Sequence, residues 1–308
     1  MDFYLILSKV SVIFLLILVG FFLAKKGFLT EQSQKEMTSL ILYVLLPCTL
    51  IKSFDIDFSR DILNTGLKIA VTMFITYNVS YILADFIGKR YKLNLSQKDV
   101  HILSMVIPNV GFMGYPIVNA IMGPEGIIFA VMANMGFELF AWTIGIKTIS
   151  RHSHIKNTDN IIVHLLKTPA IIAIIIGMIL FTTPLSVPEP LKSTMLLLAS
   201  AMSPIAMIIV GISLANSHIT KLLKNKHMYI TCITRLVVIP LLLLTALKTL
   251  KFYETLYYLP MILISMPTAG YATMFATKYE SDSVLASELI SMSTLFSLIT
   301  IPVILSLL

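Results

Sequence analysis

The residues best suited to bind a ligand gather in two short segments that interrupt apolar sequence. Residues 107–116 read Ile-Pro-Asn-Val-Gly-Phe-Met-Gly-Tyr-Pro, and residues 266–271 read Met-Pro-Thr-Ala-Gly-Tyr. A transmembrane helix tolerates such prolines and glycines only where the freed backbone groups face protein partners or a water-filled cavity. Helix starts at such a break carry unpaired N–H groups and a partial positive charge, which suit an anion such as a carboxylate. We therefore expect a substrate site formed by Pro108, Asn109, Gly111, Gly114, Tyr115, Pro267, Thr268, Gly270 and Tyr271.

Within these segments, each residue type has a distinct expected role. Asn109 and Thr268 each directly follow a proline, so they occupy equivalent positions and offer side-chain hydrogen bonds. The glycines allow the backbone to approach a ligand closely. Tyr115 and Tyr271 offer hydroxyl groups or close the site against water, although buried aromatic side chains often only pack. The alternative is a pair of kinked helices whose small residues serve helix packing.

Two ionisable residues lie deep inside apolar stretches. Glu138 and Arg235 sit roughly 12–15 Å from one end of their predicted membrane spans, at 1.5 Å per helical residue. Their similar depth and opposite charge make an ion pair between them one expectation. Glu138 is then a proton-coupling carboxylate or the partner of Arg235, and Arg235 attracts an anionic substrate or fixes that carboxylate. The alternative is a buried ion pair that only locks two helices together.

The composition places these residues in a membrane protein. Of 308 residues, 57% are hydrophobic and 13% are charged, and the mean hydropathy is +0.89. Soluble domains carry about 45–50% apolar and about 25% charged residues. The net charge of +7 lies in short loops, which indicates membrane topology rather than a nucleic-acid surface.

The sequence gives no sign of an enzyme. It contains no Gly-rich phosphate loop, no His-Glu-x-x-His and no Gly-x-Ser-x-Gly. These absences argue against an ATP-driven pump and an intramembrane hydrolase. We expect neither a cofactor nor a bound metal.

Apolar runs predict an all-α polytopic membrane protein with ten transmembrane helices, since a span needs about 20 apolar residues. They lie near 4–24, 36–53, 66–88, 99–121, 126–148, 165–183, 191–215, 227–247, 255–277 and 284–307. Lys and Arg are concentrated in one set of alternate loops, which we assign to the cytoplasm. Both termini are then expected outside the plasma (cell inner) membrane.

Five spans in each half mean that residues 1–150 and 165–308 enter the membrane in opposite senses, joined by a cytoplasmic linker at 151–164. The halves share Pro-x-x-Gly, with Pro108 matching Pro267 and Gly111 matching Gly270. Although such matches can arise by chance, the agreement in span order favours two inverted five-helix repeats with broken, crossing fourth and ninth helices.

The sequence resembles the auxin efflux carrier family, which includes plant PIN-type auxin exporters and bacterial carriers of malate, malonate and similar acids. The residues that carry this resemblance are Asn109-Val-Gly-Phe-Met-Gly-Tyr-Pro116, Leu46-Pro47, Gly123-Pro124-Glu125-Gly126 and Ser203-Pro204. The resemblance implies a scaffold of spans 1, 2, 6 and 7, a mobile transport bundle of spans 3–5 and 8–10, and an elevator-type cycle. It also implies that Asn109 is the main polar substrate contact.

We therefore predict a secondary transporter that moves a small organic anion across the plasma membrane. The substrate is expected to be a mono- or dicarboxylate such as malate or malonate, or an auxin-like acid. One alternative is a sodium- or proton-coupled ion exchanger of related fold, and another is a membrane-embedded metabolite sensor. The expected surroundings are the lipid bilayer, with a homodimer left open as the assembly.

Overall fold

The computed structural model describes residues 3–152, 168–183, 185, 187–216 and 225–308. Most of the predicted linker at 151–164 therefore lies outside the described residues. The helices of the first half are α1 (Phe3–Lys25), α2 (Glu31–Leu40), η1 (Ile41–Leu45), α3 (Leu46–Ser53), α4 (Arg60–Gly88), α5 (Leu95–Val106), η2 (Val110–Gly114), α6 (Tyr115–Met122), α7 (Pro124–Phe140), η3 (Ala141–Gly145) and α8 (Ile146–Ser150).

The second half is also built from helices, and its described residues include no strand beyond the isolated bridge at Thr268. Its helices are α10 (Pro169–Thr182), α11 (Glu189–Asn216), α13 (Lys226–Ile233), η4 (Thr234–Val238), α14 (Ile239–Thr249), α15 (Thr255–Ile264), α16 (Tyr271–Lys278) and α17 (Ser283–Leu305). The η segments are π-helical turns, in which each hydrogen bond spans one residue more than in an α-helix.

Six of the continuous helices are long and apolar enough to cross a membrane: Glu31–Ser53, Arg60–Gly88, Pro124–Ser150, Glu189–Asn216, Lys226–Thr249 and Ser283–Leu305. Shorter apolar helices cover Val10–Lys25, Val110–Met122, Pro169–Thr182 and Thr255–Ile264. The predicted all-α class is therefore confirmed for the residues that the structure describes, and the apolar helices agree with a polytopic membrane protein. The count of ten spans and the inverted repeat stay predictions.

Three of the π-helical turns have a common cause in the sequence. Pro47, Pro116 and Pro240 each stand two residues after the end of η1, η2 or η4. A proline ring inside a helix clashes with the carbonyl group four residues before it. In all three cases that carbonyl lies within the π-helical turn, where the wider spacing leaves room for the ring, so the helix continues past the proline.

Two long helix pairs approach closely through glycine. A Cβ atom on Gly20 of α1 would lie 2.2 Å from the Ile208 carbonyl oxygen of α11, and one on Gly211 would lie 2.1 Å from the Ile17 carbonyl oxygen. Likewise, a Cβ on Gly136 of α7 would lie 2.5 Å from a backbone oxygen of α4. Small residues at such contacts let membrane helices pack backbone against backbone.

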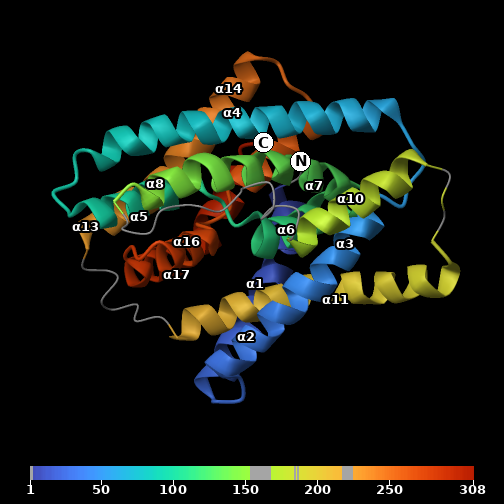
Figure 1. Cartoon of the computed structure of the whole chain (residues 1–308), viewed down its shortest axis with the longest axis horizontal. Coiled ribbons are helices and arrows are strands. Elements are labelled where there is room, and N and C mark those ends of the chain that lie inside the picture. Colours follow the sequence, from blue (N-terminus) through green and yellow to red (C-terminus); the bar gives the residue numbers. More distant parts are fainter. Residues whose placement is uncertain (1–2, 153–167, 184, 186, 217–224) are drawn as a thin grey trace.

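The helices pack as two groups. The α11 group consists of α1, α2, α3, α10 and α11, which pack chiefly on one another. The α4 group consists of α4–α8 and α13–α17, including the broken helices α5–α6 and α15–α16. In Figure 1, α4 crosses the upper part of the view and α11 the lower part, with α5, α6 and α16 between them. Contacts between the groups run mainly through α6, α7, η2 and α17.

Candidate functional site

The two Pro-x-x-Gly segments meet where α5 and α15 end. The Asn109 N–H donates to the Pro267 carbonyl at 2.7 Å, and the Ala269 N–H donates to the Ile107 carbonyl at 3.0 Å. Pro108 and Thr268 thus form an isolated antiparallel bridge. The structure therefore brings the two broken helices together at the residues that the sequence aligned.

Arg235 lies on the side of this crossing where the helices end. Its side chain is fully buried and reaches the crossing from η4. Its guanidinium group donates hydrogen bonds to four backbone carbonyl oxygens, those of Met105 (3.3 Å), Val106 (3.0 Å), Ile264 (2.5 Å) and Met266 (3.0 Å). The C-terminal ends of helices carry unpaired carbonyls and a partial negative charge. Arg235 satisfies these acceptors for both broken helices.

Thr268 is part of the closed packing around the crossing. It is 1% exposed, its hydroxyl donates to the Ser104 carbonyl at 2.9 Å, and its N–H donates to Ser293 Oγ at 3.1 Å. The structure therefore uses the Thr268 side chain inside the protein and does not place it in a cavity.

Asn109 and Gly270 lie at the helix starts and line a cavity of about 170 Å³. Asn109 Oδ1 accepts the Phe112 N–H at 3.2 Å, which caps the start of η2. Gly270 is the N-cap of α16, where a Cβ atom would meet open space. Among the described residues, neither the Asn109 amide nitrogen nor the Gly270 N–H has an acceptor. These donors are available to a ligand.

Most of the polar residues that complete this cavity were not predicted from the sequence. It lies between the two packing groups, and its further lining residues are Gln34, Thr38, Phe112, Ile209, Val210, Ser213, Leu214, Ile290, Ser291 and Thr294. A wider cavity of about 970 Å³ adjoins it and adds Glu31, Lys35 and Glu288. A polar stripe at helical spacing, with Ser287, Ser291 and Thr294 on α17, was the available signal.

Glu138 and Arg235 do not form the ion pair that the sequence predicted. Among the described residues, Glu138 instead accepts hydrogen bonds from the Tyr271 hydroxyl at 2.9 Å, Trp142 Nε1 at 2.8 Å and Asn134 Nδ2 at 3.3 Å. The two side chains bind different groups. Glu138 is tied to the first residue of α16, directly after Gly270.

The other residues of the predicted substrate site are either packed inside the protein or face open space. Pro108 and Pro267 are buried in the crossing. A Cβ on Gly111 would meet open space, whereas one on Gly114 would lie 3.1 Å from a side-chain carbon of α15, so Gly114 serves packing. Tyr115 is buried and lines a different cavity of about 270 Å³.

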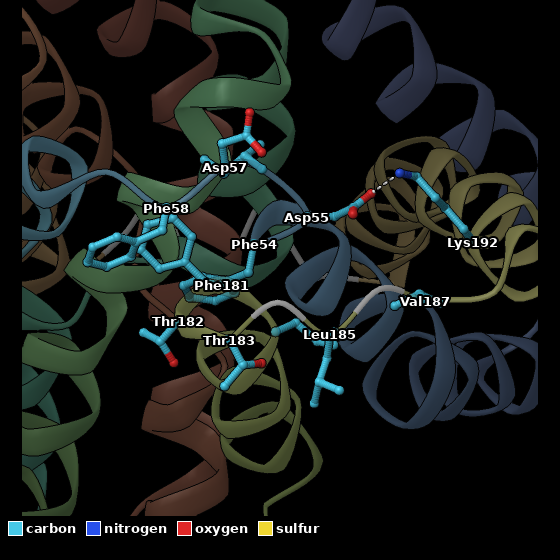
Figure 2. Close-up of a pocket in the computed structure, with 12 residues that line it drawn as sticks. Phe54, Asp55, Asp57, Phe58, Phe181, Thr182, Thr183, Leu185, Val187 and Lys192 are labelled. Carbon is cyan, nitrogen blue, oxygen red and sulfur yellow. Dashed lines mark ion pairs between the residues drawn. The ribbon is translucent and has the colours of Figure 1, made fainter.

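A further cavity of about 680 Å³ lies away from the crossing, beside the ends of α3 and α10. Figure 2 shows Phe54, Phe58 and Phe181 along one side and the ion pair between Asp55 and Lys192, at 2.8 Å, on the other. Its lining includes no residue of the two Pro-x-x-Gly segments.

In the part of the chain that the structure describes, no group of three or more His, Cys, Asp or Glu residues could hold a metal ion.

Comparison with known proteins gives consistent relatives. A family model described as "Membrane transport protein" matches residues 5–305. An uncharacterized transporter of Methanocaldococcus jannaschii is 28% identical over 302 residues, which cover 96% of each chain. An uncharacterized transporter of Methanothermobacter thermautotrophicus is 26% identical over 296 residues, which cover 94% of each chain.

Proposed function

The chain belongs to the membrane transport protein family, the auxin efflux carrier family that its motifs resemble, and on this premise we propose that it is a secondary carrier of a small organic anion. The observation that carries this proposal is the cavity at the helix starts, where Asn109 and Gly270 offer hydrogen-bond donors without acceptors. A mono- or dicarboxylate such as malonate or malate, or an auxin-like acid, suits these donors.

The cavity next to Asn109 lacks the carboxylate that a cation site needs. No Asp or Glu lines the cavity next to Asn109, and the acidic residues Glu31 and Glu288 lie in the wider one. A sodium- or proton-binding exchanger needs a carboxylate at the crossing. The buried carboxylate Glu138 does not line this cavity and accepts hydrogen bonds from Tyr271, Trp142 and Asn134. The ion-exchanger alternative is therefore weaker than the organic-anion carrier.

We further propose that the carrier works by an elevator-type movement. Support comes from the packing, because the α4 group holds both broken helices while the α11 group packs mainly on itself. The cavity lies between the groups, with Thr38 and Ser213 from one and Asn109 and Thr294 from the other. In this proposal the α11 group (spans 1, 2, 6 and 7) is the scaffold, and the α4 group (spans 3–5 and 8–10) moves the bound anion.

Glu138 is the proposed coupling residue. The Tyr271 hydroxyl donates to this carboxylate and belongs to the first residue of α16, beside the Gly270 N–H. A change in the protonation of Glu138 would change the charge of the acceptor that Tyr271 binds, and so alter the start of α16. The alternative role is structural, because a fully hydrogen-bonded buried carboxylate can simply fix helices.

The test is counterflow of labelled malonate and malate in proteoliposomes. Saturable exchange that depends on internal unlabelled acid is the expected result for a carrier. Binding to the purified protein without any flux would instead support the metabolite sensor. Exchange of sodium or protons without an organic acid would support the ion exchanger.

A further inference from the structure

The environment of Arg235 is unusual for a buried charge. Proteins normally pair a buried guanidinium with a carboxylate, because removing an unpaired charge from water is costly. Among the described residues, no Asp or Glu forms an ion pair with Arg235. Its partners are instead four backbone carbonyl oxygens, two from the end of each broken helix. We call these four carbonyls, of Met105, Val106, Ile264 and Met266, the carbonyl cage.

A cage of backbone carbonyls is a cation-binding arrangement. Carbonyl oxygens at helix C-termini and unwound segments bind dissociable cations in membrane proteins, because each oxygen carries partial negative charge. The cage adds the negative ends of α5 and α15 to this field. In the part of the chain that the structure describes, no other cationic side chain donates to these four carbonyls, and the neighbouring Pro267 and Ile107 carbonyls are paired with backbone N–H groups.

We propose that Arg235 is a tethered cation that permanently occupies a cation site at the helix crossing, so that the carrier binds its anion without a dissociable metal cation such as sodium. This inference rests on the proposed function, because it names the residue that sets the ion requirement of the same site. With the cage neutralised, the positive helix starts at Asn109 and Gly270 dominate the field in the cavity. Arg235 is a positioning residue and does not line the cavity.

The tether also fixes the geometry of the crossing. The cage draws two carbonyls from α5 and two from the α15 segment onto one planar group with a rigid set of donors. The Asn109–Pro267 and Ile107–Ala269 backbone hydrogen bonds lie directly beside them. Removing the guanidinium group therefore leaves four acceptors facing one another and disturbs the helix starts on the far side.

The first experiment tests the cage without transport. Arg235→Ala would be purified beside the wild type and Leu236→Ala, a matched control that empties a buried position in the same helical turn. Each would be melted with guanidinium chloride, sodium chloride or choline chloride at roughly 20 mM, too dilute for guanidinium to denature. We expect guanidinium, and sodium to a smaller extent, to raise the melting temperature of Arg235→Ala alone, since a ligand of the folded state stabilises it.

The second experiment measures uptake of labelled malonate in proteoliposomes. Wild-type uptake is expected to be the same in sodium and choline buffers. Arg235→Ala should raise KM at least about tenfold, the cost of losing hydrogen bonds to a charged group. Added guanidinium or sodium should recover part of this loss. A merely structural role would change protein yield but would not create a requirement for a cation.

Arg235→Lys keeps the test decisive if Arg235→Ala does not fold. A lysine ammonium keeps the charge with three donors, so uptake should remain independent of sodium with a smaller increase in KM. Sodium-dependent uptake by the wild type or by Arg235→Lys would overturn the proposal. A folded Arg235→Ala whose melting temperature does not change with guanidinium would also overturn it. Failure of the wild type to move any organic anion would overturn the proposed function instead, and the melting experiment would still test the cage.

Discussion

The two sides of the helix crossing satisfy their backbone groups in opposite ways. On one side the helix ends meet, and Arg235 pairs with the carbonyls of Met105, Val106, Ile264 and Met266. On the other side the helix starts meet at Asn109 and Gly270, whose donors face a cavity. The closed side therefore has its cation within the chain, whereas the open side presents hydrogen-bond donors, which suit an acceptor.

The largest effect is expected on the free energy of unfolding when the Arg235 guanidinium is removed from the closed side. Arg235→Met keeps most of the side-chain volume but leaves four buried carbonyls unpaired, and each such group costs about 1–3 kcal/mol. The free energy of unfolding should fall by at least about 3 kcal/mol, measured by denaturant titration in detergent. Leu236→Ala is the control for lost packing. A melting curve of Arg235→Met that overlays the wild type would contradict the account of this side.

The next effect is expected from filling the open side. Gly270→Ala adds a Cβ atom that meets no protein atom within 4 Å, so the fold should tolerate it. The methyl group would stand in the cavity beside the Gly270 N–H and should weaken anion binding about tenfold, equivalent to about 1.4 kcal/mol. Isothermal titration with malonate measures this. Equal affinity in a stable variant would show that the anion binds elsewhere.

Glu138→Gln distinguishes a proton-coupling role of Glu138 from a purely structural role, next to the start of α16 on the open side. The amide keeps the shape of the carboxylate and can still accept from Tyr271, but it cannot titrate. If Glu138 couples protons, the variant should transport with a flat pH profile, measured as uptake between pH 5 and 8. A pH profile identical to that of the wild type would remove the coupling role and leave the structural one.

The smallest effect is expected from Thr268→Val, which sharpens the contrast with Asn109. The substitution removes the hydroxyl that donates to the Ser104 carbonyl and keeps the branched shape. Stability should fall by about 1 kcal/mol, with malonate affinity unchanged. Titration and denaturant unfolding of the same preparation measure both quantities. A loss of affinity without a loss of stability would return Thr268 to the substrate site.

The sequence predicted the crossing because its cause is local. Pro-x-x-Gly segments interrupt helices through backbone chemistry alone, so Pro108 and Pro267 marked both breaks before any packing was known. The apolar runs predicted the helical class for the same reason, since bilayer thickness sets span length.

The partners of the buried charges could not be predicted in the same way. Hydropathy gives the depth of Glu138 and Arg235 along their helices but not the direction in which each side chain points. The π-helical turn η4 shifts that direction further, because each extra residue in a turn rotates the helix face. Arg235 therefore faces the carbonyl cage rather than Glu138.

The polar cavity lining was missed because of where one helix begins. The second span was predicted to start at residue 36, whereas α2 starts at Glu31 with two polar turns. Gln34 and Thr38 lie four residues apart on one face of α2 and line the cavity. Their low hydropathy is typical of a loop, so they were not included in the predicted span. Equivalent positions in the two halves also do not guarantee equivalent surroundings. Asn109 and Thr268 occupy matching positions in the sequence, yet Asn109 lines the cavity and Thr268 is buried in the core.

Malonate counterflow by Asn109→Ala tests the central claim most directly. The control is Asn78→Ala, which removes an amide that only donates to a carbonyl within α4. We expect both variants to fold, with saturable counterflow retained in Asn78→Ala and reduced at least about tenfold in Asn109→Ala. Wild-type counterflow in a folded Asn109→Ala would contradict the assignment of this crossing as the substrate site.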